Sequence, residues 1–250
     1  MLNADDDLVA AMAPRTSAQV VTFGAVADGR TPDVAVSEVT TDELGRQSFE
    51  LAHRGSGATV HLAQVGAFQW RNAAAAAAMA LATGLDLDTV AYSLGDAASA
   101  SHWRMELTER PDGLVVLNDS YNANPESMRA ALETLAGIGT RTGRRTVAVL
   151  GEMFELGEGA VAAHTGVGTY AAESGVDVLV TVGSAAGATA RGFEVVGGRG
   201  KAVSTVGRDE AADWLRHNVS AADVVLVKAS RGAALELLAD DLIEQGSSTA

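Results

Sequence analysis

The second half of the chain alternates short apolar segments with longer helical ones, and this alternation constrains the fold more than any other feature. The apolar segments predict strands at residues 113–117, 146–150, 178–182, 202–206 and 224–227. The segments between and after them predict helices at residues 125–137, 159–174, 185–193, 209–218 and 235–245. Apolar strands separated by helices are typical of a parallel sheet with both faces covered. We therefore expect an α/β fold with a doubly wound, parallel-sheet C-terminal domain.

The first hundred residues follow a different pattern. Strands are predicted at residues 19–23, 33–39, 47–52 and 59–65, and three of them alternate polar with apolar residues. Such alternation is typical of antiparallel strands with one solvated face. Helices are predicted at residues 72–83, where we interpret the alanine run as a closely packed buried helix, and at 88–97. Small and polar residues at 97–102 predict a boundary between domains 1–100 and 101–250.

Composition excludes several classes of function. Asp and Glu number 32 against 18 for Lys and Arg, a formal charge of -14, so we expect no nucleic-acid partner. The chain has no cysteine, which excludes disulfides and thiolate metal sites. Its first residues include the acids Asp5, Asp6 and Asp7 instead of a basic signal sequence, and no apolar run reaches the roughly 20 residues of a membrane span. We expect a cytoplasmic protein without a membrane partner.

The run from Asn118 to Pro125 is the strongest motif, because polar side chains crowd the end of a predicted strand. Ligands of parallel α/β sheets bind at the carboxyl ends of the strands. Asp119, Tyr121 and Asn122 are therefore candidate ligand contacts. For Asn124 an alternative is open, since it is also well suited to cap a helix whose first residue is Pro125.

Two further motifs follow later strands. Lys228, Ser230 and Arg231 lie where a strand gives way to a helix, so cations, a hydroxyl and backbone amides favour a carboxylate or phosphate there. The alternative is an ordinary turn in which Ser230 caps the last helix. The segment 151–157, Gly-Glu-Met-Phe-Glu-Leu-Gly, and His164 form a less specific motif, and a lone histidine on a helix is also explained as structural or exposed.

These motifs, in this order, resemble those of the Mur ligases, ATP-dependent amide ligases of peptidoglycan precursor synthesis. The run Tyr-Asn-Ala-Asn-Pro at 121–125 is similar to the members that add D-alanyl-D-alanine to UDP-N-acetylmuramoyl-tripeptide. Segment 151–157 with His164 matches the next signature, and Lys228, Ser230 and Arg231 match the last, with Ala229 where glycine is usual. The resemblance implies that residues 1–100 are the C-terminal remnant of the central ATP-binding domain and residues 101–250 the Rossmann-like C-terminal domain.

The resemblance also assigns site residues. It implies that Gln69 and Asn72 contact the adenine of ATP and that Arg104 and Asp119 reach its phosphate and ribose, although Asn72 also suits a helix N-cap. The dipeptide would contact the remaining matched positions, which are Tyr121, Asn122, Asn124, Lys228, Ser230 and Arg231. A dipeptide carboxylate requires cations or amides, and an adenine edge suits a carboxamide. No metal ligand is predicted within the chain.

The sequence departs from the family pattern at two places. The phosphate loop of these ligases ends in Gly-Lys-Thr or Gly-Lys-Ser, and neither occurs here. Phe68 stands where the family carries a histidine before the adenine-binding asparagine. The resemblance implies ATP and Mg²⁺ as cofactors, but we expect the phosphate loop and the Mg²⁺ ligands to lie outside this sequence, in a separately encoded front half or in a part lost by truncation.

We therefore expect the chain to belong to an ATP-dependent ligase of cell-wall biogenesis, and so to serve cell shape and division, but to be inactive alone. The reaction that the resemblance implies activates the tripeptide carboxylate as an acyl phosphate, which the amine of the dipeptide attacks. One alternative is a related Mur-type or folylpolyglutamate-type ligase with another acceptor. The other is a non-catalytic α/β binding module left after loss of the ATPase core.

Overall fold

The computed structural model describes residues 1–27, 29–97 and 102–244, and the chain divides into two compact units, Met1–Ala100 and Ser101–Ala250. The predicted boundary at 97–102 includes residues 98–101, which lie outside the described residues. In the described parts, none of the helices is both long and apolar enough to cross a membrane.

The first unit is built on one five-stranded sheet of order β1-β2-β3-β4-β5. Its strands are β1 (Leu2–Asn3), β2 (Thr22–Ala25), β3 (Val34–Thr41), β4 (Arg46–His53) and β5 (Ser56–Val65). Its helical segments are α1 (Asp7–Ala10), η1 (Ala13–Arg15), α2 (Gln69–Ala82) and α3 (Leu87–Asp96). The expected antiparallel pairing holds for β3, β4 and β5, whereas β1, β2 and β3 pair in parallel. The sequence pattern did not predict this parallel part.

The alanine-rich helix α2 packs closely against this sheet, as expected. Ala74, Ala77 and Ala78 are fully buried and share a core with Phe49 and Leu51 of β4. Methyl groups on this face let the helix approach the strands closely, because they fill little space. The helix begins at Gln69, three residues before the predicted start, and Phe68 occupies the N-cap position. The alternative role of Asn72 as an N-cap is therefore wrong.

The second unit contains a six-stranded sheet of order β10-β9-β8-β11-β7-β6. The strands are β6 (Glu106–Glu109), β7 (Val115–Asp119), β8 (Arg145–Leu150), β9 (Val178–Val182), β10 (Lys201–Thr205) and β11 (Asp223–Lys228). All pairs are parallel except β6 with β7, which is antiparallel. The doubly wound parallel sheet is thus confirmed. The edge strand β6 was not predicted, because its Glu-Leu-Thr-Glu sequence is short and largely polar.

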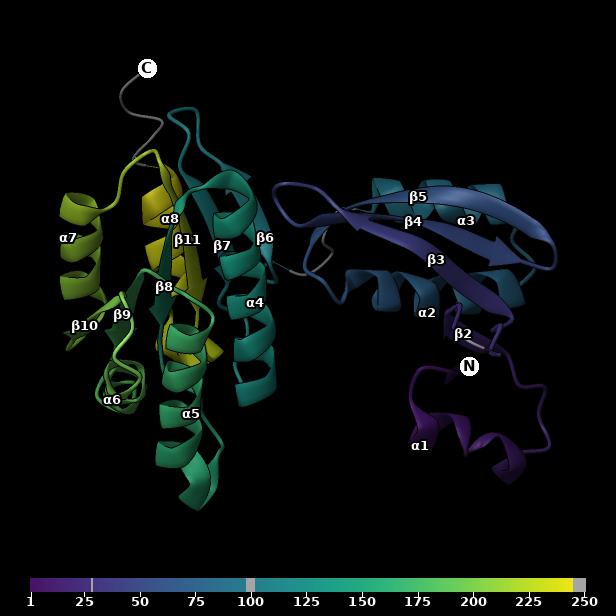
Figure 1. Cartoon of the computed structure of the whole chain (residues 1–250), viewed down its shortest axis with the longest axis horizontal. Helices are drawn as coiled ribbons and strands as arrows, with labels where there is room; N and C mark the ends of the chain where they lie inside the picture. The colour runs from purple at the N-terminus through teal and green to yellow at the C-terminus, as the bar shows by residue number, and fades with distance from the viewer. Residues whose placement is uncertain (28, 98–101, 245–250) are drawn as a thin grey trace. The chain divides into compact units, whose positions relative to one another are not determined.

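Helices cover both faces of this sheet (Figure 1). They are α4 (Pro125–Thr142), α5 (Ala160–Glu173), α6 (Gly187–Val195), α7 (Arg208–Asn218) and α8 (Glu236–Glu244), with short 3₁₀ turns η2 (Gly157–Gly159) and η3 (Arg231–Ala233). One set of strand side chains packs with α7 and α8, as Val149 and Val227 do with Leu215 and Leu238. Alternate side chains point to the other face, toward α4, α5 and α6. The predicted helix end at Gln245 lies outside the described residues.

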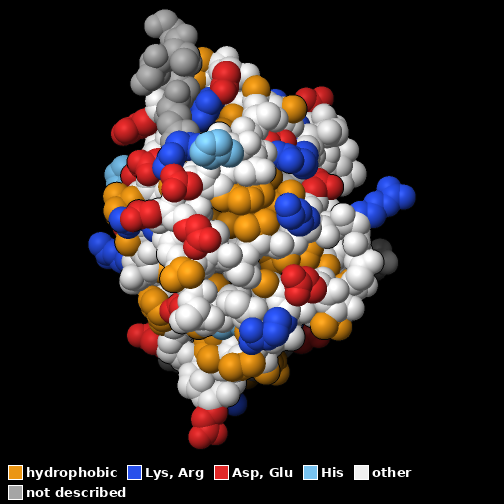
Figure 2. All heavy atoms as spheres, turned by 90° about the vertical axis from the view of Figure 1, so that its left-hand side faces the viewer, with side chains coloured by type: hydrophobic (Ala, Val, Ile, Leu, Met, Phe, Trp, Pro, Cys, Tyr) orange, Lys and Arg blue, Asp and Glu red, His pale blue; other side chains and the backbone are white. Residues whose placement is uncertain are grey.

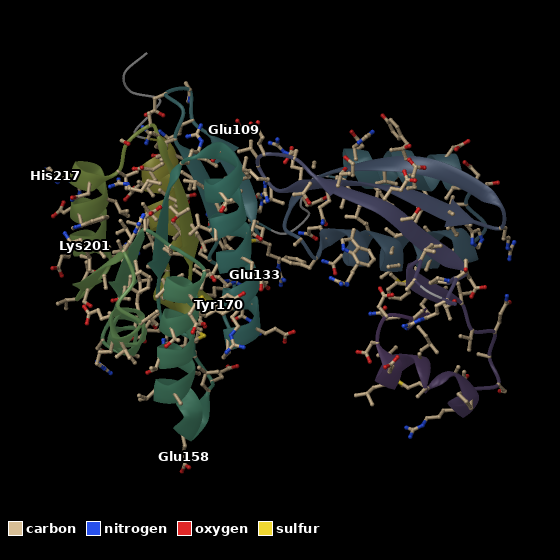
Figure 3. All side chains as sticks on the ribbon, viewed as in Figure 1. Glu109, Glu133, Glu158, Tyr170, Lys201 and His217 are labelled. Carbon is tan, nitrogen blue, oxygen red and sulfur yellow. The ribbon has the colours of Figure 1, made fainter. Side chains whose placement is uncertain are left out.

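Contacts between helices use polar as well as apolar groups. The Tyr170 hydroxyl on α5 donates a hydrogen bond to the Glu133 carboxylate on α4, and the two side chains face each other in Figure 3. This bond raises the pKa of Tyr170.

On the surface shown in Figure 2, acidic, basic and apolar side chains are interspersed. Val195, the last residue of α6, and Val206, which follows the edge strand β10, are 85% and 90% exposed.

Candidate functional site

Sheet register in the second unit brings two distant residues together. Strand β11 lies between β8 and β7, and Lys228, its last residue, is opposite Asp119, the last residue of β7. Strand β7 ends two residues later than predicted and β11 one residue later, so both residues end a strand instead of following it. The carboxyl ends of β7, β8 and β11 therefore form the edge at which a ligand of this fold is expected.

Asp119 and Lys228 form a buried ion pair at this edge. The Lys228 Nζ lies 2.5 Å from the Asp119 Oδ2 and donates a second hydrogen bond, at 3.0 Å, to the carbonyl oxygen of Asn122. The Lys228 side chain is 2% exposed and that of Asp119 14%. The other carboxylate oxygen, Oδ1, accepts from the backbone N–H of Met105 at 3.1 Å. Burial raises the pKa of Asp119, although Lys228 acts in the opposite direction.

Two guanidinium groups gather around the ring of Tyr121. The Arg104 group lies 4.2 Å from the ring centroid and the Arg231 group 5.7 Å from it. Arg231 also lies 5.9 Å from the indole of Trp103. Arg104 and Arg231 are exposed and Tyr121 is half-buried. Cations held over aromatic faces keep their outer donors available, so this cluster can bind a carboxylate or phosphate.

Ser230 links the loops around the site. Its hydroxyl accepts from the backbone N–H of Phe154 at 3.0 Å and lies 3.4 Å from the carbonyl oxygen of Ala123, to which it donates. Its own N–H donates to the carbonyl of Glu152 at 3.0 Å. Ser230 is only 4% exposed, so its hydrogen bonds hold the loops of the site together more than they present a group at the surface. The alternative that its side chain caps the last helix is wrong, because Ser230 precedes the 3₁₀ turn η3 and not α8, and its side chain makes no capping hydrogen bond to η3.

Asn122 and Asn124 behave differently from each other. Asn124 caps α4, because its side chain accepts from the N–H of Ser127 at 2.8 Å, and the Ser127 hydroxyl accepts from the N–H of Asn124 at 3.1 Å. The capping alternative for Asn124 is thus confirmed. Asn122 is exposed, and its Oδ1 accepts from the N–H of Ala123 at 2.8 Å, which leaves its amide nitrogen facing solvent.

His164 is a buried structural histidine of the site, which is one of the two explanations that the sequence left open for it. It is 1% exposed, its Nε2 lies 3.2 Å from the backbone nitrogen of Met153, and its Nδ1 lies 3.1 Å from the Thr189 Oγ1. A backbone N–H can only donate, so Nε2 accepts and Nδ1 carries the proton. Burial lowers the pKa of His164, which favours this neutral form. The signal in the sequence was its place after the 151–157 motif.

Within the second unit, the non-glycine residues with positive φ lie in the same loops. Trp103, Met105, Glu155 and Ala234 have positive φ angles of 62°, 48°, 63° and 51°. Trp103 and Met105 flank Arg104, Glu155 follows the turn bonded to Ser230, and Ala234 directly follows η3, the turn that begins at Arg231. Non-glycine residues in this conformation cost about 1–3 kcal/mol each and persist where the surrounding structure holds them. These loops are therefore held in defined, unfavourable shapes.

In the first unit, Gln69 and Asn72 form a pair of carboxamides on the first turn of α2. The Asn72 Nδ2 donates to the Gln69 Oε1 at 3.0 Å, and the Asn72 side chain is exposed. The pair therefore presents an acceptor, the Asn72 Oδ1, beside the remaining donors of both amides. This combination fits the edge of an adenine ring.

Magnesium is a different case. Among the described residues, no group of three or more His, Asp or Glu side chains is arranged to hold a metal ion. The donor set therefore does not fit Mg²⁺, and no chemical step is assigned to this ion.

Close packing at Gly151 gives a testable prediction for the site. A Cβ at this position would lie 2.7 Å from the Ala229 Cβ and 2.9 Å from the Leu235 Cδ1. We expect Gly151→Ala to lower the free energy of unfolding by about 1–3 kcal/mol, because the added methyl group is forced against a strand end. Gly151→Ala combined with Ala229→Gly is expected to recover most of this loss in urea unfolding. Additive losses in the double variant would contradict the close packing.

The fold and the site define a doubly wound α/β unit that can bind an anion at the carboxyl edge of its sheet. The family model for the Mur ligase, glutamate ligase domain matches residues 103–231. The chain therefore belongs to the Mur ligase family.

Individual relatives point to one branch of this family. Over 97% of its length the chain is 42% identical to the UDP-N-acetylmuramoyl-tripeptide–D-alanyl-D-alanine ligase of Mycobacterium tuberculosis, of which it covers 50%. It resembles the crystal structure of MurF from Acinetobacter baumannii with a TM-score of 0.80 and 29% identity, over 97% of this chain and 51% of that one. MurF ligase from Thermotoga maritima in complex with ADP, at 24% identity and a TM-score of 0.76, shares the fold over 98% of this chain and 53% of that one. The chain thus spans about half the length of these relatives.

Proposed function

We propose that this chain provides the dipeptide-binding part of an ATP-dependent ligase that joins D-alanyl-D-alanine to UDP-N-acetylmuramoyl-tripeptide. The observation that carries the proposal is the arrangement of Arg231, Tyr121 and Asn122 around the buried Asp119–Lys228 pair. A relative named for this reaction is 42% identical. Peptidoglycan precursor synthesis and an intracellular location follow from the same proposal.

The six proposed dipeptide residues divide into two groups. Arg231, Tyr121 and Asn122 are accessible, so we assign them direct contacts, with Arg231 binding the carboxylate. Lys228 and Ser230 are buried and bonded within the protein, and Asn124 caps α4. For these three we infer a supporting role in which they hold Asn122 and Arg231 in place.

We further propose that residues 1–100 are the back part of a central ATP-binding domain and residues 101–250 the C-terminal ligase domain. Gln69 and Asn72 would hold the adenine, and Arg104 and Asp119 the phosphate and ribose. ATP would supply the phosphoryl group that activates the tripeptide carboxylate. None of the 250 residues forms the Gly-Lys-Thr or Gly-Lys-Ser end of a phosphate loop, so amide formation would require that loop from elsewhere, such as a separately encoded front half.

Calorimetry on the whole chain tests the proposal. We expect heat of binding with D-alanyl-D-alanine but not with L-alanyl-L-alanine or free D-alanine. Arg231→Gln is expected to weaken binding about tenfold or more, because a hydrogen bond to a charged group contributes about 1.5–3 kcal/mol. Arg199→Gln is the matched control, since Arg199 is also exposed but lies before β10. Absence of binding by the unmodified chain, or equal affinity for the L-dipeptide, would refute the assignment.

A further inference from the structure

The turn formed by residues 151–154, here named the Gly151 turn, is bonded to two parts of the second unit. On one side it is bonded to helices: the N–H of Met153 donates to His164 on α5, and the carboxylate of Glu152 accepts from the N–H of Ala185, two residues before α6, at 2.9 Å. On the other side it is bonded to the residues that follow β11. The Gly151 turn is therefore the physical link between α5, α6 and the site.

The bonds on the site side are specific. The N–H of Gly151 donates to the Lys228 carbonyl at 2.9 Å, and the Ser230 N–H donates to the Glu152 carbonyl at 3.0 Å. The Phe154 N–H donates to the Ser230 hydroxyl at 3.0 Å. The ring of Phe154 also covers Gly232, where a Cβ would lie 2.7 Å from its Cε2 atom. Both residues that flank Arg231 are thus in contact with the turn.

We propose that His164 is a positioning residue for Arg231, which acts by holding the Gly151 turn against α5 and α6. The neutral tautomer of His164 joins Met153 to Thr189, which lies on α6. Without the Nε2 acceptor, the N–H of Met153 would lose its partner in a buried place, and the turn would shift or open to water. Because Ser230 and Gly232 contact this turn, the displacement would reach Arg231 between them. The effect of His164 on the dipeptide rests on the proposed function, whereas its hold on the turn does not.

An alternative is that the hydrogen bonds of His164 serve only to fix α5 to α6. In that case, replacing His164 would affect the stability of the helices and leave the loop at Arg231 unchanged. The strained φ of 63° at Glu155, directly after the turn, indicates that external contacts hold the loop in its shape. The sensitive readouts are therefore the amides of the turn and of residues 230–231, compared with amides of the central strands.

The experiment compares variants of the whole chain by NMR-detected amide exchange and by calorimetry with D-alanyl-D-alanine. His164→Leu removes both hydrogen bonds at similar size, and His164→Gln keeps an acceptor near the Nε2 position. Thr189→Val removes only the second partner. His217→Leu is the matched control, because His217 is exposed on α7 and its Nδ1 is bonded to the Asp213 carbonyl of the same helix.

For His164→Leu we expect exchange of the Met153, Phe154 and Ser230 amides to accelerate about tenfold or more, the equivalent of about 1.4 kcal/mol, with Leu226 unchanged. Dipeptide affinity is expected to fall by a similar factor, and His164→Gln is expected to restore both quantities. Thr189→Val should show the same changes at reduced size.

Two results would overturn the inference: turn amides that exchange as in the unmodified chain, or a loosened turn with unchanged Ser230 and Arg231 signals. If the unmodified chain does not bind the dipeptide, the proposed function fails, and the amide signals still decide the role of His164.

Discussion

Replacing Gly168 by alanine is expected to destabilise the second unit by about 3 kcal/mol or more. A Cβ at Gly168 on α5 would lie 1.8 Å from the carbonyl oxygen and 2.7 Å from the carbonyl carbon of Thr189 on α6. Backbone atoms cannot rotate away as a flexible side chain can, so the two helices must separate. The cost is therefore at or above the upper end of the usual range of about 1–3 kcal/mol for overpacking.

Gly166 provides a matched control on the same helix. A Cβ at Gly166 meets no atom within 4 Å, so Gly166→Ala should be neutral or stabilising by up to about 1 kcal/mol through higher helix propensity. Gly192→Ala is expected to reproduce the loss from the α6 side, since its Cβ would lie 2.0 Å from the Thr165 oxygen. Urea unfolding of the three variants measures these differences. Equal stability of Gly168→Ala and Gly166→Ala would show that the helices do not cross this closely.

This crossing also matters for the site. The backbone carbonyl of Thr189 lies against Gly168, and the Thr189 hydroxyl is bonded to His164. The N–H that binds Glu152 belongs to Ala185, two residues before α6. The separation of α5 and α6 therefore sets the position of the groups that hold the Gly151 turn. Helix packing, turn geometry and the loop at Arg231 form one continuous set of contacts.

Much of the second unit could be predicted from the sequence. Its parallel strands are short and mostly apolar, and this pattern indicates a parallel sheet between helices, although the ends of β7 and β11 were placed one or two residues short. Asn124 followed by Pro125 predicted the start of α4 correctly. In contrast, β1, α1 and β6 are too short or too polar to produce a periodic signal.

The site could be predicted only in part. The motifs indicated which residues lie at strand ends, and the parallel register then brings Asp119 and Lys228 together across more than a hundred residues. The sequence did not indicate that Asp119 and Lys228 would be occupied by hydrogen bonds within the protein. The roles of Ser230 and His164 depend on loop-to-loop hydrogen bonds that no local pattern encodes. The pairing of Arg104 and Arg231 over Tyr121 is likewise a property of the folded loops.

The Asp119–Lys228 pair has the second large expected effect. Lys228→Met is expected to lower the free energy of unfolding by about 3–5 kcal/mol at pH 7, because removing one member of a buried pair leaves the other charge uncompensated. Asp119→Asn should cost a similar amount, since the Lys228 side chain is only 2% exposed. The double variant is expected to lose much less than the sum, because it leaves no buried charge.

The pH dependence of Lys228→Met provides an independent check. Burial already raises the pKa of Asp119 in the folded protein, and removal of the cation would raise it further. A carboxyl group whose pKa is higher in the folded state stabilises the fold at low pH, and this contribution is lost as the pH rises through the folded-state pKa. The penalty of Lys228→Met should therefore shrink as the pH falls from about 7 toward the unfolded-state pKa of about 3.9, whereas that of Asp119→Asn should not. Parallel pH profiles for the two variants, measured by urea unfolding, would mean that the carboxylate of Asp119 is solvated and that Lys228 is not its counter-ion.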